Sequence, residues 1–200
     1  MKTTTKFLAV AFVILGSSLN VFSTDPSQSV YIKSLGEKIF VLYMSGEYPE
    51  QSQVSIKNMN GELIHHEVLK DNMLYSKKFN LQQLASGHYF LELETTRTIE
   101  RLPLIITKTE LSFLDEEKQV INKPFMRHNG NILDVMLFSP NMLPIEITVS
   151  DQNSNVLFRD DIVKEMKVEK QYDFSAFSPG VYNVAITTQG RQYDHLMPVQ

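Results

Sequence analysis

Histidine and carboxylate side chains are the groups in this 200-residue chain that could do chemistry, and their spacing predicts no metal site. Of the five histidines, two stand together in the cluster His65-His66-Glu67. Neighbouring residues of a strand point to opposite faces, so His65 and His66 cannot hold one metal ion, whereas His65 and Glu67 share a face. Two ligands fall short of the set that a protein zinc site uses, so we expect no bound metal.

The remaining sequence gives no sign of an enzyme. The acidic pairs Glu116-Glu117 and Asp160-Asp161 are interpreted as solvated turns or strand edges, and nothing predicts the opposed carboxylates of a glycosidase. The chain has no Gly-x-Ser-x-Gly turn, phosphate-binding loop or dinucleotide fingerprint, and no cysteine for thiol catalysis or metal binding. We therefore expect no catalytic residue and no cofactor, with a small carbohydrate-active or hydrolytic protein as an alternative.

The first 23 residues are typical of a secretory signal peptide. Lys2 and Lys6 precede an apolar run at residues 7–15, and residues 21–23 offer a cleavage site. That run is shorter than the roughly 20 residues needed to cross a bilayer, and no later run reaches this length, so we expect no membrane span after cleavage. The net charge of -4 argues against a nucleic-acid partner. These features predict a secreted bacterial protein that is periplasmic or lies at the cell surface.

The chain after the signal peptide has the pattern of β-strands. Apolar and polar residues alternate over residues 54–57, 91–94 and 146–149. Asn60-Gly61 lies between two alternating segments and indicates a hairpin turn. Short strands separated by turn residues predict an all-β fold of the sandwich type.

An internal repeat divides the chain into two similar parts. When residues 54–93 are placed on residues 147–186 without a gap, five of the 40 pairs are identical. We therefore predict two tandem immunoglobulin-like β-sandwich domains of about seven strands each, at residues 25–107 and 108–200. Thr107 to Glu110 is interpreted as a short, semi-rigid linker between them.

Glycine and tyrosine recur together in both repeats, as Gly87 with Tyr89 and Gly180 with Tyr182. A glycine here supplies a positive φ, or lets the chain pass close to the end of the sandwich. A buried tyrosine whose hydroxyl reaches the backbone would fix the corner, as in immunoglobulin-type sandwiches. We prefer this structural role to a ligand-stacking one, because the residues recur at one structural spacing.

Asn80 and Asp173 occupy equivalent positions before these pairs, and each is expected to form a turn with its own downstream backbone. The segments FNLQQLASGHY at residues 79–89 and YDFSAFSPGVY at residues 172–182 resemble the C-terminal sorting domain of type IX secretion cargo and related immunoglobulin-like modules of secreted bacterial proteins. The resemblance implies a β-sandwich, and it allows residues 108–200 to act as a sorting or export module.

The leading functional hypothesis is a non-enzymatic structural or binding module of the bacterial envelope. Such a module would engage a protein partner through loops or strand edges. Two loops supply candidate contact residues, namely Tyr48 in the first half and Met142 with Leu143 in the second. An alternative is that Leu143 packs beneath the end of the sandwich.

Overall fold

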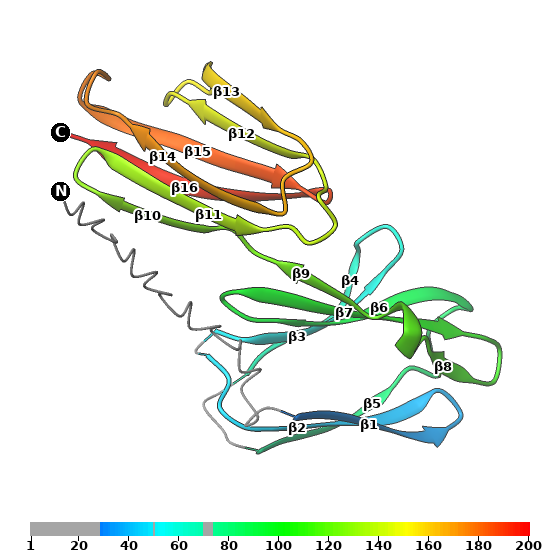
Figure 1. Ribbon diagram of the computed structural model, residues 1–200. Helices are drawn as coiled ribbons and strands as arrows, with labels where there is room; N and C mark the ends of the chain where they lie inside the picture. The colour runs from blue at the N-terminus through cyan, green and yellow to red at the C-terminus, as the bar shows by residue number, and fades with distance from the viewer. Residues whose placement is uncertain (1–28, 50, 70–73) are drawn as a thin grey trace, which may run out of the picture.

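A computed structural model describes residues 29–49, 51–69 and 74–200. The signal peptide predicted at residues 1–23 lies outside these residues. The described chain consists of β-strands and one short 3-10 helix, which confirms the prediction of an all-β fold. Figure 1 shows the strands gathered into two groups, one from each half of the chain, with a single strand running between them.

The first half forms two antiparallel sheets around one core. Its strands are β1 (Ser29–Gly36), β2 (Ile39–Ser45), β3 (Gln53–Asn58), β4 (Leu63–Val68), β5 (Leu74–Asn80), β6 (Gly87–Glu94) and β7 (Thr98–Ile106). The smaller sheet has the order β1-β2-β5, and β4-β3-β6-β7 forms the larger one. Phe40 and Leu42 of the smaller sheet pack with Val54, Ile56 and Leu104 of the larger one, all almost inaccessible to solvent.

Two further strands extend the larger sheet of the first half, and a short 3-10 helix lies between them. They are β8 (Leu111–Phe113), the 3-10 helix η1 (Asp115–Glu117) and β9 (Gln119–Asn122). Both β8 and β9 pair with β7. The backbone N–H of Thr107 donates to the carbonyl of Glu110 at 2.9 Å, closing a tight turn between β7 and β8. This segment is therefore a hairpin turn, and its interpretation as an inter-domain linker is wrong.

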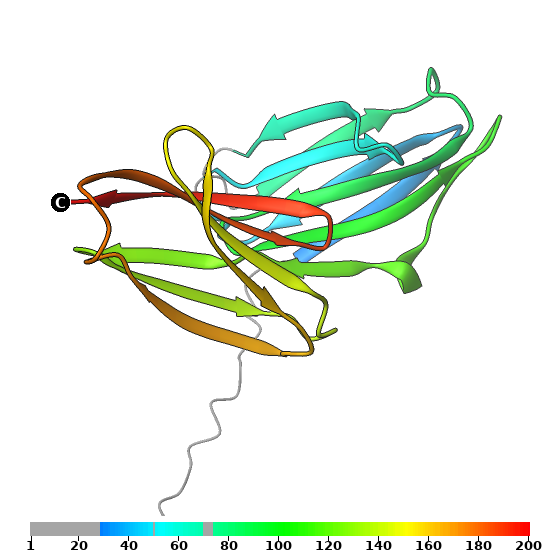
Figure 2. The same cartoon turned by 90° about the horizontal axis from the view of Figure 1, so that it is seen from above.

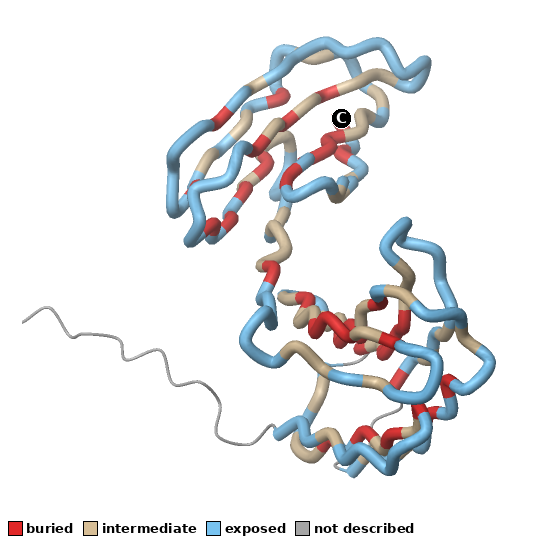
Figure 3. The backbone as a smooth tube through the Cα atoms, turned by 90° about the vertical axis from the view of Figure 1, so that its right-hand side faces the viewer, coloured by how far each residue is buried: buried red, intermediate tan, exposed pale blue. Residues whose placement is uncertain are grey.

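The second half repeats the two-sheet arrangement. Its strands are β10 (Phe125–Asn129), β11 (Ile132–Phe138), β12 (Ile145–Ser150), β13 (Val156–Ile162), β14 (Lys167–Asp173), β15 (Gly180–Thr188) and β16 (Arg191–Val199). They form sheets of order β10-β11-β14 and β13-β12-β15-β16. A separate core contains Leu133, Ile147, Val184 and Ile186. Figure 3 shows that each half has its own set of buried positions.

The two halves match strand for strand at the offset found in the sequence. The strands β2 and β11, β5 and β14, and β7 and β16 each begin and end 93 residues apart. The order of strands in the sheets is also the same. Since β8 and β9 belong to the sheet of the first half, the expected boundary between residues 107 and 108 does not coincide with a change of sheet. We propose the boundary between β9 and β10 in its place.

Candidate functional site

The recurrent tyrosines make the same backbone contact in both halves. The Tyr89 hydroxyl donates to the carbonyl oxygen of Ala85 at 3.0 Å, and the Tyr182 hydroxyl donates to that of Ser178 at 2.9 Å. Tyr89 is buried within its core, and Tyr182 packs partly buried against the second core. Both rings thus tie the start of a central strand to the turn four residues upstream, which leaves them little surface for stacking on a ligand.

The recurrent glycines differ in backbone conformation, since φ is positive at Gly87 and not at Gly180. Gly87 has a φ of 159°, which is almost fully extended, and Gly180 is not among the glycines of positive φ. The positive-φ expectation is therefore wrong for Gly180. A Cβ at Gly87 would lie 3.8 Å from the Tyr89 ring, and one at Gly180 would lie 3.9 Å from the Tyr182 ring. Each glycine thus lies beside the ring of the tyrosine that follows it, at a distance where a Cβ would make an ordinary van der Waals contact.

Asn80 and Asp173 close equivalent turns at the ends of β5 and β14. The Asn80 Oδ1 accepts a hydrogen bond from the backbone N–H of Gln82 at 3.0 Å. The Asp173 Oδ1 accepts one from the backbone N–H of Ser175 at 2.8 Å. Hydrogen bonds from the Ser175 side chain and backbone lower the pKa of the Asp173 carboxyl. Each side chain replaces a backbone acceptor, so the strand ends in the same way in both halves.

An acid–lysine pair bridges the two sheets in each half. The Asp160 carboxylate on β13 accepts hydrogen bonds from Lys170 on β14 at 2.7 Å and from the Tyr172 hydroxyl at 2.8 Å. Glu67 on β4 pairs in the same way with Lys77 on β5. The hydrogen bond from Lys170 holds the pKa of Asp160 below its ordinary value. The identical lysines of the repeat thus fasten the same edge of each sandwich, and the acidic residue Asp160 is not simply solvated.

The strongest charged cluster joins the two halves of the chain. Glu92 on β6 is fully buried, and its carboxylate accepts hydrogen bonds from Lys57 at 2.6 Å, Arg101 at 2.7 Å and Arg191 at 2.6 Å. Arg191 begins β16 of the second half, 99 residues from Glu92. Burial raises the pKa of the Glu92 carboxyl, but the hydrogen bonds from Lys57 and Arg101 and the charge of Arg191 outweigh it, so the pKa lies below 4.5.

The predicted contact residues differ in how much of their surface is exposed to solvent. Tyr48 packs partly buried against the first core, and its hydroxyl donates to the carbonyl of Ser29 at 3.4 Å. Met142 is 46% exposed and Leu143 is 37% exposed, in the loop after β11. The backbone N–H of Leu143 donates to the Ser139 hydroxyl at 3.2 Å, which fixes the loop. The second-half loop therefore presents an apolar tip, whereas Tyr48 is largely occupied in packing.

Two edge strands present further apolar side chains. The strands β4 and β13 end the larger sheets, and among the described strands each pairs on one side only. The side chains of Val156, Leu157 and Phe158 at the start of β13 are between 42% and 55% exposed. These equivalent strands give the chain two unpaired backbone edges, of which β13 carries the longer apolar run.

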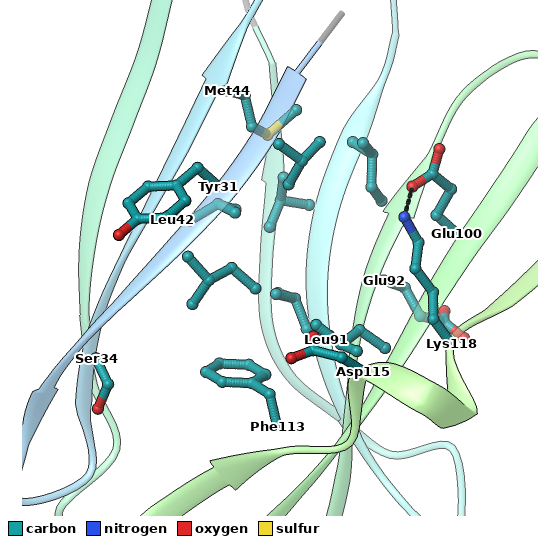
Figure 4. A pocket seen from close by; sticks show the side chains of 15 residues that line it. Tyr31, Ser34, Leu42, Met44, Leu91, Glu92, Glu100, Phe113, Asp115 and Lys118 are labelled. Atoms are coloured by element: carbon teal, nitrogen blue, oxygen red, sulfur yellow. Dashed lines mark ion pairs between the residues drawn. The ribbon is translucent and has the colours of Figure 1, made fainter. Parts of the chain in front are cut away.

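A cavity of about 400 Å³ lies between the two sheets of the first half. Leu42 and Met44 of the smaller sheet line it, as do Leu91 of the larger sheet and Phe113 of β8 (Figure 4). At its edge the Lys118 ammonium pairs with the Glu100 carboxylate at 2.7 Å. The arrangement is a mainly apolar space with charged groups on one side, which is a common form of small-molecule site.

The histidines form no metal centre. Within the described residues no three histidine or acidic side chains are close enough to hold a metal ion. The Nε2 of His65 lies 3.7 Å from Glu67, whose carboxylate is already bound by Lys77 and Tyr75. His128 and His195 do meet, with 2.9 Å between two ring nitrogens, a contact that the sequence did not indicate. In the described part of the chain, no helix has the length and apolar character needed to cross a membrane.

Comparisons with known proteins agree with the motif in the first half. Residues 37–107 match the model of the family described as secretion system C-terminal sorting domain, which implies a secreted or cell-surface protein. No curated protein matches the chain. A solved structure titled "Biofilm associated protein - BSP domain" matches at 11% identity with a TM-score of 0.29, over 87% of this chain and 29% of that chain. The first half of this chain is thus similar to the secretion system C-terminal sorting domain, as the segment at residues 79–89 predicted.

Proposed function

We propose that this protein is a non-enzymatic binding module of the bacterial envelope, which holds a protein partner by strand addition at β13. The family match at residues 37–107 supports secretion or display at the cell surface. The observation that carries the binding role is the unpaired edge of β13, where three consecutive apolar side chains are exposed. An edge strand offers a row of free backbone groups to an incoming strand, and adjacent side chains give specificity.

The chemistry of β13 indicates the kind of segment that would bind there. Phe158 lies on the inner face of the strand beside the ring of Tyr172, at 5.9 Å between centroids. Arg159 on the outer face is near Glu146 at 3.6 Å. An extended partner segment with an apolar residue facing Phe158 and an acidic residue facing Arg159 would complement both faces.

Photo-crosslinking at the strand edge tests this proposal. A crosslinking residue in place of Arg159 should capture a partner from envelope fractions, and peptide mapping should place the link on one extended segment of that partner. The same residue in place of Leu196, which is 66% exposed at the opposite edge of the sheet, is the matched control. Leu157→Lys should abolish the crosslink from position 159, because it replaces the middle one of the three exposed apolar side chains that the partner segment would cover. Equal crosslinking from both positions, or no effect of Leu157→Lys, would contradict the proposal.

A second candidate function is sorting during export, which the family match favours. That match covers residues 37–107, in the first half of the chain, whereas the expectation from the sequence put the sorting module at residues 108–200. The intact mass of the protein from periplasmic, surface and medium fractions separates the two functions. Proteolytic removal of either half on export supports sorting, whereas retention of both halves in an envelope-bound species supports the binding module.

A further inference from the structure

The cavity between the sheets of the first half reaches into the core but opens to solvent at one side, where Val30 and Tyr31 are 43% and 61% exposed. Protein interiors are close-packed, with few voids larger than a water molecule. At about 30 Å³ for each water-sized group, 400 Å³ corresponds to roughly a dozen non-hydrogen atoms. Truncation of one large side chain does not create so much space, so the cavity is large enough for a separate small molecule.

One side of this cavity is lined by a segment that lacks an equivalent in the described part of the second half, whereas the rest of the lining comes from β1, β2, β3, β6 and β7. Phe113 of β8 and Asp115 of η1 lie together at one side of the cavity in Figure 4. The sheet of the second half ends instead at β16, where His195 takes the position equivalent to Leu102 and contacts His128. The histidines thus span the edge of the second sandwich, whereas added elements enclose a space at the edge of the first.

The charges beside the cavity favour one kind of ligand head. Lys118 and Glu100 pair with each other at 2.7 Å. Glu92, which also lines the cavity, is bound by the three cations described above. Among the described residues, no side chain pairs with the carboxylate of Asp115, which also lines the cavity. Of the four charged residues that line the cavity, Asp115 is therefore the one whose side chain has no partner within the described chain, and a positively charged head would be complementary to its carboxylate.

We propose that the first sandwich binds a small amphiphile, whose apolar tail enters the cavity and whose cationic head lies beside Asp115. The tail would contact Leu91, Leu102 and Phe113, and it would have about the length of a twelve-atom chain. The contribution of the head is modest because Asp115 is exposed to solvent. Exposed charge pairs change binding by roughly two- to fivefold. This site is separate from β13 and does not depend on the proposed strand addition.

Displacement of a neutral fluorescent probe tests both parts of this proposal. N-phenyl-1-naphthylamine should bind the full chain, and dodecylamine, dodecanol and dodecanoate should displace it, all below their micellar concentrations. We expect dodecylamine to bind about two- to fivefold more tightly than dodecanol, and dodecanoate most weakly. Asp115→Asn should remove the advantage of the amine, while Glu116→Gln, the matched control beside it in η1, should leave it intact. Tightest binding of dodecanoate would overturn the assignment of the head.

Filling the cavity tests where the tail lies. Leu102→Phe should abolish probe binding, and Leu196→Phe, which adds the same ring on an exposed strand position, should not. Leu102→Phe should also leave the melting temperature near that of wild type, because it fills empty space. Leu104→Phe, two residues away in the close-packed core, should lower it by about 3–10 °C. Absence of probe binding by wild type, or unchanged binding by Leu102→Phe, would refute the proposal.

Discussion

Replacing Glu92 by glutamine should destabilise the protein and loosen the contact between its halves. The carboxylate of Glu92 is fully buried and accepts bonds from three cations at 2.6–2.7 Å. Glutamine keeps the shape of the side chain but removes its charge. Three positive groups would then lie together without the acid that compensates them, and one of them, Arg191, comes from the other half of the chain.

The size of the effect follows from the burial of the four groups. Removing one partner of a fully buried ion pair costs about 3–5 kcal/mol. The three cationic side chains retain 21–26% of their exposure, so water can solvate them in part. We therefore expect Glu92→Gln to lower the free energy of unfolding by about 2–3 kcal/mol. Losing one cation alone, as in Arg191→Gln or Lys57→Gln, should cost about 1 kcal/mol.

Urea unfolding measures the stability of each variant, and small-angle X-ray scattering measures how far its two halves move relative to each other. Arg191→Gln should widen the distribution of distances between the halves, whereas Lys57→Gln, which removes a bond within the first half, should leave that distribution unchanged. Glu92→Gln should do both, lowering the urea midpoint and widening the distribution. A loss below 0.5 kcal/mol for Glu92→Gln, or equal widening in the two single-cation variants, would refute the reasoning.

Three further predictions concern the recurrent contacts and the loop. Tyr182→Phe removes the hydroxyl that donates to Ser178 at 2.9 Å, and urea unfolding should show a loss of about 1 kcal/mol; no loss would mean that the bond adds nothing. The pKa of Asp160 lies below its ordinary value of 3.8, so the pairing of its carboxylate with Lys170 stabilises the protein above that pH. In urea unfolding at pH 7, Asp160→Asn should therefore lower the free energy of unfolding by up to about 1 kcal/mol. The difference from wild type should shrink as the pH falls below about 3.8. Replacing Met142 and Leu143 together by serine should change the thermal stability by less than about 0.5 kcal/mol, and a loss near 2 kcal/mol would show that Leu143 packs beneath the sandwich.

The strands could be predicted because their signals are local. The alternation at residues 54–57 lies within β3, and that at residues 91–94 lies in the second half of β6. The repeat offset of 93 also holds for β7 and β16, outside the residues first compared. Side-chain alternation fixes which face of a strand is buried, so similar alternation in the two halves specifies similar strands.

Most of the features that could not be predicted from the sequence depend on residues far apart in the chain. Glu92 and Arg191 are separated by 99 residues, and neither stands in a local motif that would indicate the other. The strands β8 and β9 are three and four residues long, too short for periodicity to identify them. Gly180 does not have the positive φ that its position suggested, because it is already the first residue of β15.

The pairing of β9 with β7 has a mechanical consequence. The backbone N–H of Lys123 donates to the carbonyl of Arg97 at 2.8 Å, and its ammonium pairs with Glu94 at 2.7 Å, so the chain is fastened to the first sandwich one residue beyond β9. Pro124 alone then separates this point from the start of β10. Because the connection is so short, a force that pulls on the second sandwich acts directly on the hydrogen bonds between β9 and β7. Under such a force, we expect the pairing of β9 with β7 to break before the core of either sandwich opens.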